Sequence, residues 1–232
     1  MSSREPGRVD EDRLLRVEDQ GRVLDTAGIE VSTHLWYVWT EIAIEHEWLA
    51  KRARRLYEAD RSAVVPLEDE MKASLVAVTG VTHCLDALQN EIAALGVLSG
   101  DTLARWQRRK PRAHTAVFQT LRETFPSAEL EHGVERGLEE LYRLRNEVVH
   151  QRPTSGPIVE HPALGMRTTP AAARYTVECA TQAVDLLFHI LRAVGAEHDD
   201  EPPSANAWAR TWRLSIGELT SGRDVESLWL KH

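Results

Sequence analysis

The sequence predicts an all-α protein built as an antiparallel helical bundle of about five main helices. Apolar residues recur at three- and four-residue steps over long stretches, whereas no segment shows a clear strand pattern. Proline and glycine residues separate these stretches, as is typical of helix boundaries. A chain of 232 residues suits one main core with added segments. We therefore predict a flexible N-terminal tail (1–28), a helical domain (29–197) and a C-terminal extension with a short helix (198–232).

The first long helix is predicted between residues 31 and 60. Its apolar stripe is formed by Leu35, Val38, Trp39, Ile42, Leu49, Ala53 and Leu56. We expect this stripe to face the core, because apolar residues at this spacing share one helical face. Trp36 and Trp39 are expected to be anchors in the core or in a dimer interface, and residues 45–47 to lie on the surface.

A second long helix is predicted over residues 66–96 by a heptad repeat. The repeat consists of Met71, Val78, Val81, Leu85, Leu88, Ile92 and Leu95. A sustained heptad indicates a helix that packs lengthwise against another helix. We expect its partner to be the helix at 130–150.

Further helices are predicted at about 113–125, 130–149 and 170–195. The segment 152–169 contains three prolines and two glycines, and its length suggests a functional or mobile loop. After a proline-containing hinge, an apolar segment around Trp208 predicts the short C-terminal helix.

Composition excludes several classes of protein. No apolar run approaches the roughly 20 residues of a membrane helix, and the N-terminus lacks the apolar centre of a signal peptide, so we expect a cytoplasmic protein without a membrane segment. Cys84 and Cys179 have no metal-ligand spacing, which argues against a disulfide scaffold or a structural zinc site. Since no phosphate-binding glycine loop or metalloprotease motif occurs, we expect no metal and no cofactor.

A formal net charge of -8 opposes nucleic-acid binding by bulk electrostatics, so any such contact must be a local basic patch. The dense basic cluster lies beside Trp106 and comprises Arg108, Arg109, Lys110 and Arg112. It is either a solvated connector or a surface that follows RNA phosphates with a stacking tryptophan.

The segment 141–150 carries the most informative pattern. On a helix, Arg145 falls inside an apolar stripe that includes Leu138, Leu141 and Val148. An arginine there costs several kcal/mol unless an anion meets it, because its guanidinium does not lose its proton. The anion is either a carboxylate of another helix or a phosphate group.

The sequence Arg145-Asn146-x-x-x-His150 resembles the signature of HEPN domains. The resemblance implies a metal-independent ribonuclease, frequently dimeric, in which two such motifs line one cleft. His150 would then act as general base on the ribose 2′-hydroxyl, Arg145 would stabilise charge on the phosphate, and Asn146 would position the phosphate or the histidine. Arg143 is either a second phosphate contact or a solvated residue.

Two function classes stay open. The first is an RNA-cleaving HEPN-type enzyme of toxin–antitoxin or phage-defence systems, with RNA as substrate, a protein antitoxin as a candidate partner, and a homodimer that places Arg145 and His150 near the subunit boundary. The second is a noncatalytic helical module that binds nucleotide, RNA or a protein partner. The negative net charge favours the second class, whereas Arg145 in its stripe together with His150 favours the first.

On a regular helix, five residues separate the side chains of Arg145 and His150 by about 140°. Their convergence therefore needs an irregular helix end, the length of arginine, or a second subunit.

Overall fold

The computed structural model describes residues 16–18, 22–24, 30–32, 34–128, 130, 132–150, 157–196 and 200–221. The predicted all-α class is confirmed. The helices are α1 (Leu35–Ala59), α2 (Val65–Ala93), α3 (Gly100–Arg108), α4 (Ala113–Thr124), α5 (His132–His150), α6 (Pro170–Arg174), α7 (Val177–Gly195) and α8 (Pro203–Thr220). Within the described ranges, no helix has the length and apolar character needed to span a membrane.

The chain divides into two compact units, residues 1–35 and 36–232. The first contains a three-stranded antiparallel sheet of β1 (Arg16–Glu18), β2 (Arg22–Leu24) and β3 (Glu30–Ser32), in the order β1-β2-β3. The sequence predicts a tail without strands for residues 1–28, so β1 and β2 correct that expectation. Strands of three residues are too short to show a period of two.

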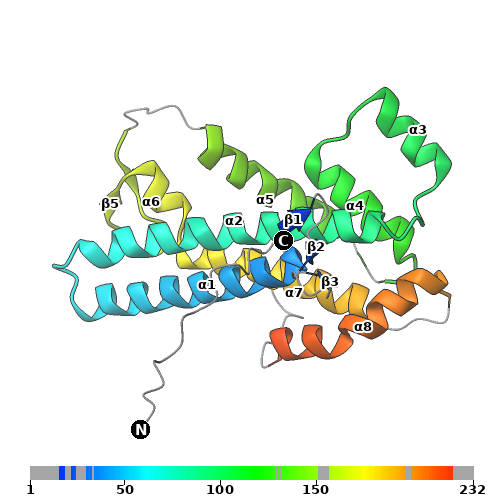
Figure 1. Cartoon of the computed structure of the whole chain (residues 1–232). Helices are drawn as coiled ribbons and strands as arrows, with labels where there is room; N and C mark the ends of the chain where they lie inside the picture. Colours follow the sequence, from blue (N-terminus) through cyan, green and yellow to red (C-terminus); the bar gives the residue numbers. More distant parts are fainter. Residues whose placement is uncertain are drawn as a thin grey trace, which may run out of the picture. The chain divides into compact units, whose positions relative to one another are not determined.

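Helix α2 forms the centre of the second unit. It packs against α4, α5, α6 and α7 (Figure 1). Five of its predicted heptad residues are fully buried: Val78, Val81, Leu85, Leu88 and Ile92. The predicted packing of this helix along α5 is therefore confirmed, and α2 packs against further helices because its apolar surface is wider than one heptad stripe.

Helix α1 buries a different face from the one predicted. Leu35, Val38 and Leu56 are 40–54% exposed. Of the predicted stripe, only Ala53 belongs to the buried face, which consists of Trp36, Thr40, Ala43, Glu47, Ala50, Ala53, Arg54 and Tyr57. Its alanines let α1 approach α2 so closely that a Cβ added at Gly80 would lie 3.3 Å from the Cβ of Ala43. Small side chains carry little hydrophobic signal in a sequence, although they allow close helix contacts.

The predicted helix at 170–195 is divided into α6 and α7. The break lies at Tyr175 and Thr176, where the Thr176 side chain caps α7 by accepting a hydrogen bond from the Cys179 amide. The Tyr175 hydroxyl donates to the Leu144 carbonyl of α5 at 2.9 Å. This break therefore ties the start of α7 to the C-terminal part of α5.

Two regions that were predicted as a loop and as an appended extension contain more regular secondary structure than expected. The predicted loop at 152–169 contains the antiparallel hairpin of β4 (Val159–Glu160) and β5 (Arg167–Thr168), with Gly165 in a left-handed conformation at φ 64°. The predicted C-terminal extension contains α8, which packs on α7 and contributes Trp208 and Ile216 to the main core. The domain boundary expected near residue 198 is therefore not a boundary of the core.

The identity of the buried face of α1 can be tested by matched substitutions. We expect Ala43→Leu to lower the free energy of unfolding by about 1–3 kcal/mol, because the larger side chain cannot fit between α1 and α2. Val38→Leu should change it by less than about 0.5 kcal/mol, since Val38 is exposed. Urea unfolding followed by circular dichroism measures both, and a larger loss for Val38→Leu would contradict the observed packing.

Candidate functional site

Arg145 continues the buried stripe of α5 toward the C-terminal end of the helix. Leu138, Leu141 and Tyr142 are 0–3% exposed, and Arg145 is half-buried one turn later. Its Nη1 donates to the Oδ1 of Asn146 at 3.1 Å, whereas its buried Nε has no partner among the described residues. No described carboxylate forms an ion pair with Arg145. Of the two anions considered from the sequence, the carboxylate of another helix is thus not found in the described part of the chain.

His150 is the last residue of α5, and its side chain lies outside the described residues. The backbone is helical from Arg145 through His150, so the irregular helix end considered from the sequence is not found between these two residues. Asn146 is exposed beside Arg145.

Arg143 faces solvent and is engaged by two carboxylates. Its Nε donates to Glu140 at 2.8 Å, and its Nη1 pairs with Glu147, which also pairs with Arg174 of α6. The hydrogen bond from Arg143 lowers the pKa of the Glu140 carboxyl. Arg143 thus matches the solvated alternative, and an RNA contact through it stays a prediction.

A hydrogen bond between the buried Tyr142 and Asp86 lies next to Arg145, and the sequence did not predict it. The Tyr142 hydroxyl donates to the Asp86 Oδ1 of α2 at 2.5 Å. Burial and the Asp86 carboxylate raise the pKa of Tyr142, while Arg145 lowers it. The phenol therefore stays protonated, and its hydrogen bond joins α5 to α2 one turn before Arg145. The sequence signal for this hydrogen bond is Asp86 itself, a charged residue next to the heptad position Leu85 of α2.

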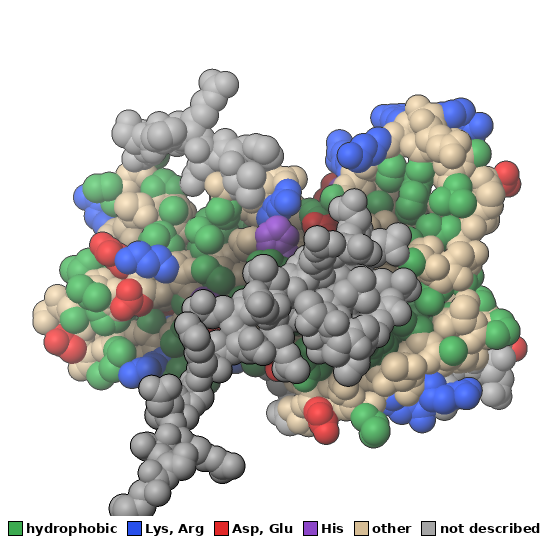
Figure 2. All heavy atoms as spheres, viewed as in Figure 1, with side chains coloured by type: hydrophobic (Ala, Val, Ile, Leu, Met, Phe, Trp, Pro, Cys, Tyr) green, Lys and Arg blue, Asp and Glu red, His purple; other side chains and the backbone are tan. Residues whose placement is uncertain are grey.

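The basic cluster lies on α3 and on the connector to α4. Contrary to the sequence prediction of a connector, Trp106 and Arg108 lie within a helix, and the Trp106 Nε1 donates to Gln119 of α4 at 2.9 Å. The half-buried indole attaches α3 to α4, which leaves less of the ring for stacking on a base. The exposed cations of the cluster are Arg108, Arg109, Lys110 and Arg112. Figure 2 shows Lys and Arg side chains gathered around α3.

Arg112 lies nearest to α5 among these cations. Its guanidinium is 3.9 Å from Glu139, and both side chains are more than half exposed. Such an exposed pair contributes little to stability. The basic cluster is therefore accessible to solvent and to a ligand.

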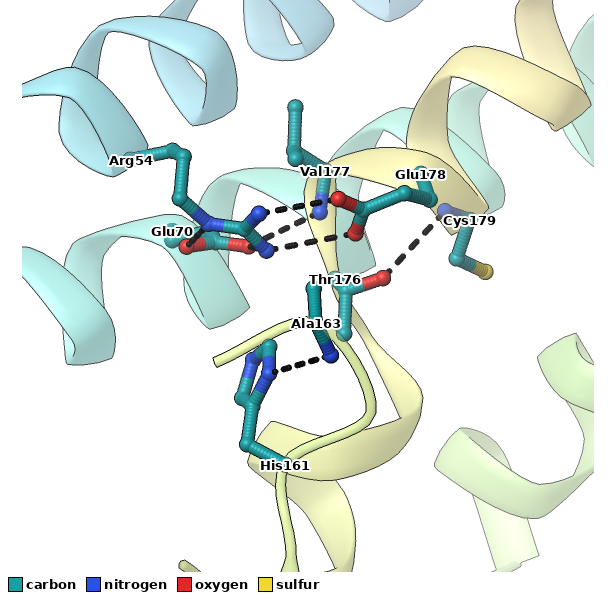
Figure 3. A network of polar contacts seen from close by, with 8 residues as sticks. All are labelled: Arg54, Glu70, His161, Ala163, Thr176, Val177, Glu178 and Cys179. Carbon is teal, nitrogen blue, oxygen red and sulfur yellow. Dashed lines mark hydrogen bonds and ion pairs between the residues drawn. The ribbon is translucent and has the colours of Figure 1, made fainter. Parts of the chain in front are cut away.

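A second charged cluster, around Arg54, was not predicted from the sequence (Figure 3). The Arg54 guanidinium is held by Glu70 of α2 at 2.7 and 2.9 Å and by Glu178 of α7 at 2.8 and 3.2 Å. The backbone amide of Val177 also donates to Glu70 at 2.9 Å. Although burial lowers the pKa of Arg54, its bonds to both carboxylates outweigh this effect and raise it. The cluster joins three helices by satisfied charges, so we interpret it as structural.

His161 of the β4–β5 hairpin lies beside this cluster (Figure 3). The imidazole is buried, and its Nδ1 accepts a hydrogen bond from the Ala163 amide at 3.3 Å. The Tyr57 hydroxyl donates to the Met166 sulfur at 3.0 Å, which connects α1 with the hairpin. Burial lowers the pKa of His161, and the Arg54 charge acts in the same direction against Glu70 and Glu178.

An open depression of about 560 Å³ adjoins the Arg54 cluster. It is lined by Lys51, Arg54, Arg55, Val177, Glu178, Thr181 and Gln182. Lys51 pairs with Glu47 at 2.6 Å, and Arg54 is held by two carboxylates. Two of the three cations that line the depression thus already pair with carboxylates of this chain, which weakens the attraction of the depression for an anion. Glu47 itself is buried and accepts from Thr181 at 2.9 Å, in contrast to the surface position predicted for it.

Comparisons with known proteins add no assignment to these sites. No protein-family model, curated protein sequence or solved structure matches this chain. The described residues contain no group of three or more His, Cys, Asp or Glu side chains placed to hold a metal ion. The chemistry of the site must therefore be argued from the residues of α5 and their neighbours.

The structural role of the Arg54 cluster predicts a large loss of stability on substitution. Arg54→Met removes the only cation that contacts Glu70 among the described residues and leaves a buried carboxylate. We expect the free energy of unfolding to fall by about 3–5 kcal/mol, the range for breaking a buried ion pair. Urea unfolding measures the loss. Lys72→Met removes an exposed cation from α2 and serves as control; an equal loss for both variants would contradict the assignment.

His161 predicts a pH-dependent part of the stability. The pKa of this histidine is lower in the folded chain than the 6.5 of a free side chain, so the unfolded chain binds more protons below about pH 6.5. The stabilisation is therefore present above this pH and is lost as the pH falls through the folded pKa. We expect His161→Gln to reduce the slope of unfolding free energy between pH 7.5 and 5.5. An unchanged slope would show that His161 does not titrate differently in the two states.

Proposed function

We propose that this chain is a HEPN-like, metal-independent endoribonuclease whose active site includes Arg145, Asn146 and His150. One observation carries the proposal: the half-buried Arg145 guanidinium has a buried Nε without a partner among the described residues. An unmet buried donor costs about 1–3 kcal/mol, so such a group is normally kept for a ligand or paired internally. A phosphate oxygen is the acceptor that fits a guanidinium best, because the planar fork forms two parallel hydrogen bonds.

The proposed reaction needs only side-chain chemistry, and in it the length of the arginine side chain brings the Arg145 guanidinium to the phosphate next to the ribose that His150 deprotonates. His150 removes the proton from a ribose 2′-hydroxyl, and the 2′-oxygen attacks the adjacent phosphorus. The bond from phosphorus to the 5′-oxygen then breaks, and that oxygen takes a proton from water to give the 5′-hydroxyl product and a 2′,3′-cyclic phosphate. The protonated His150 returns its proton to the solvent. Arg145 stabilises the additional negative charge on the phosphate oxygens, while Asn146 orients the guanidinium through its 3.1 Å hydrogen bond.

The hydrogen bonds that α5 makes with its neighbours support this role. The Tyr142–Asp86 hydrogen bond and the Tyr175–Leu144 hydrogen bond both anchor α5 close to Arg145. The guanidinium is therefore held by a helix whose position is set by two neighbouring elements, as precise phosphate positioning requires.

The exposed cations around α3 supply a path for the RNA backbone. In a chain with net charge -8, RNA must meet a local positive surface before it can reach the site. Arg108, Arg109 and Lys110 provide such a surface, and Arg112 extends it to the edge of α5, where its guanidinium lies 3.9 Å from Glu139. A toxin or phage-defence role, with a protein antitoxin as partner, is part of this proposal through the family resemblance alone.

The catalytic proposal predicts the effect of three substitutions. His150→Ala removes the base and Arg145→Ala removes the phosphate contact, so each should reduce cleavage by about 100-fold or more. Arg145→Lys should restore little activity, since an ammonium cannot form the forked contact. The measurement is cleavage of total RNA by purified protein in EDTA, with the cyclic phosphate identified by mass spectrometry.

Arg136→Ala is the matched control, because Arg136 is an exposed arginine of the same helix. It should cleave like the wild type. Cleavage that survives His150→Ala would show that the chemistry is assigned to the wrong residue. Wild-type protein that binds RNA in an Arg145-dependent way without cleaving it would instead support the noncatalytic module.

A further inference from the structure

The solvent-facing side of α1 carries a stripe of exposed residues at heptad spacing. Glu41, Glu45, Trp48, Arg52 and Arg55 follow one another in steps of four, three, four and three residues, and all are exposed. This spacing places them on a single helical face. We call these five residues the α1 stripe. It lies away from the alanine-rich face that packs into the bundle.

The charges of the α1 stripe reverse sign at Trp48. Both charged residues before it are acidic and both after it are basic. None of Glu41, Glu45, Arg52 and Arg55 has an ion-pair partner among the described residues. Arg52 also lies against the tryptophan of the stripe, with its guanidinium 5.7 Å from the centre of the Trp48 ring. In the described part of the chain, these four charges therefore have no opposite charge to pair with.

Apolar side chains accompany these charges at the centre and toward both ends of α1. Trp48 is 52% exposed, Val38 is 40% exposed and Leu56 is 54% exposed. An exposed tryptophan is unusual in a monomer surface, and tryptophan is enriched among the residues that dominate binding energy at interfaces. The stripe therefore combines a candidate anchor with flanking apolar and charged contacts.

We propose that the α1 stripe binds a second copy of this chain, with the two α1 helices antiparallel across a two-fold axis near Trp48. A two-fold axis brings the same surface of both copies together, so the surface must complement itself. Here the acidic half of one α1 faces the basic half of the other, and the two Trp48 side chains meet near the axis. A parallel arrangement would place acid against acid and base against base, which costs free energy.

This proposal is independent of the proposed ribonuclease activity. The sequence led us to expect a homodimer with Arg145 and His150 at the subunit boundary, whereas the charge order of α1 assigns self-association to another helix. The two surfaces can be separated experimentally, because the α1 stripe shares no residue with the candidate active site. Loss of RNA cleavage in Arg145→Ala with an unchanged dimer would distinguish them.

Charge reversal provides the central test. We expect the wild-type chain to be a dimer in the micromolar range by sedimentation velocity and light scattering. Glu41→Arg/Glu45→Arg makes all four charges basic, and Arg52→Glu/Arg55→Glu makes them all acidic, so each should weaken the dimer by about tenfold or more. An equimolar mixture of the two variants should form a heterodimer.

The combination of all four substitutions separates the antiparallel arrangement from a general charge effect. It reverses both halves of the stripe, and an antiparallel pair then regains acid opposite base, so the dimer should return. Arg108→Glu/Arg109→Glu alters net charge as much as Arg52→Glu/Arg55→Glu but lies on α3 and its connector, and should leave the dimer intact. Trp48→Ala should weaken it without loss of helix content.

Three outcomes would overturn the proposal. The first is a wild-type monomer throughout the micromolar range. The second is a dimer that persists in both charge-reversed variants and in Trp48→Ala, and the third is failure of the fourfold variant to associate while its circular dichroism spectrum is unchanged. Because all substituted residues are exposed, a folding defect is not expected to obscure these results.

Discussion

The buried guanidinium of Arg54 has to be paired on all sides, and this requirement fixes how three helices meet. Glu70 from α2 and Glu178 from α7 each bind it through two hydrogen bonds. A carboxylate left alone at the position of Glu70 would destabilise the fold strongly, so the three side chains depend on one another. The amide of Val177 adds the start of α7 to the same arrangement. The cluster thus connects α1, α2 and the start of α7 at one place.

Arg145 differs from Arg54 in the respect that matters for function. Both arginines lie on the core-facing side of their helix, but Arg54 uses its nitrogens on carboxylates of the same chain, whereas Arg145 keeps its buried Nε without a described partner. The first arrangement contributes to folding and uses four of the five N–H donors of the guanidinium, which leaves little capacity for a ligand. The second leaves both hydrogen-bonding capacity and charge, which is the condition for binding an anion.

The sequence predicts the fold class and the central helix because their signal lies in large apolar residues. The heptad of α2 is an example, since Leu85 and Leu88 are completely buried. The face of α1 was predicted wrongly because its contacts rely on Ala43 and Gly80, which carry almost no hydrophobic signal. For the same reason Arg54 was not recognised as buried, because it lies outside the apolar stripe that was predicted for α1. The Tyr142–Asp86 hydrogen bond joins residues 56 positions apart, so its two partners could be matched only once the tertiary arrangement was known.

The interruption between α6 and α7 attaches one short segment to two different parts of the molecule. Tyr175 binds the backbone of α5 next to Arg145, and two residues later Val177 binds Glu70 in the Arg54 cluster. Opening of either attachment must displace the segment that holds the other. In hydrogen-exchange terms, the C-terminal turns of α5 and the first turn of α7 should behave as one cooperative unit, although they belong to separate helices. The Arg145 guanidinium is thereby connected, through one short segment, to the ion pairs of the Arg54 cluster.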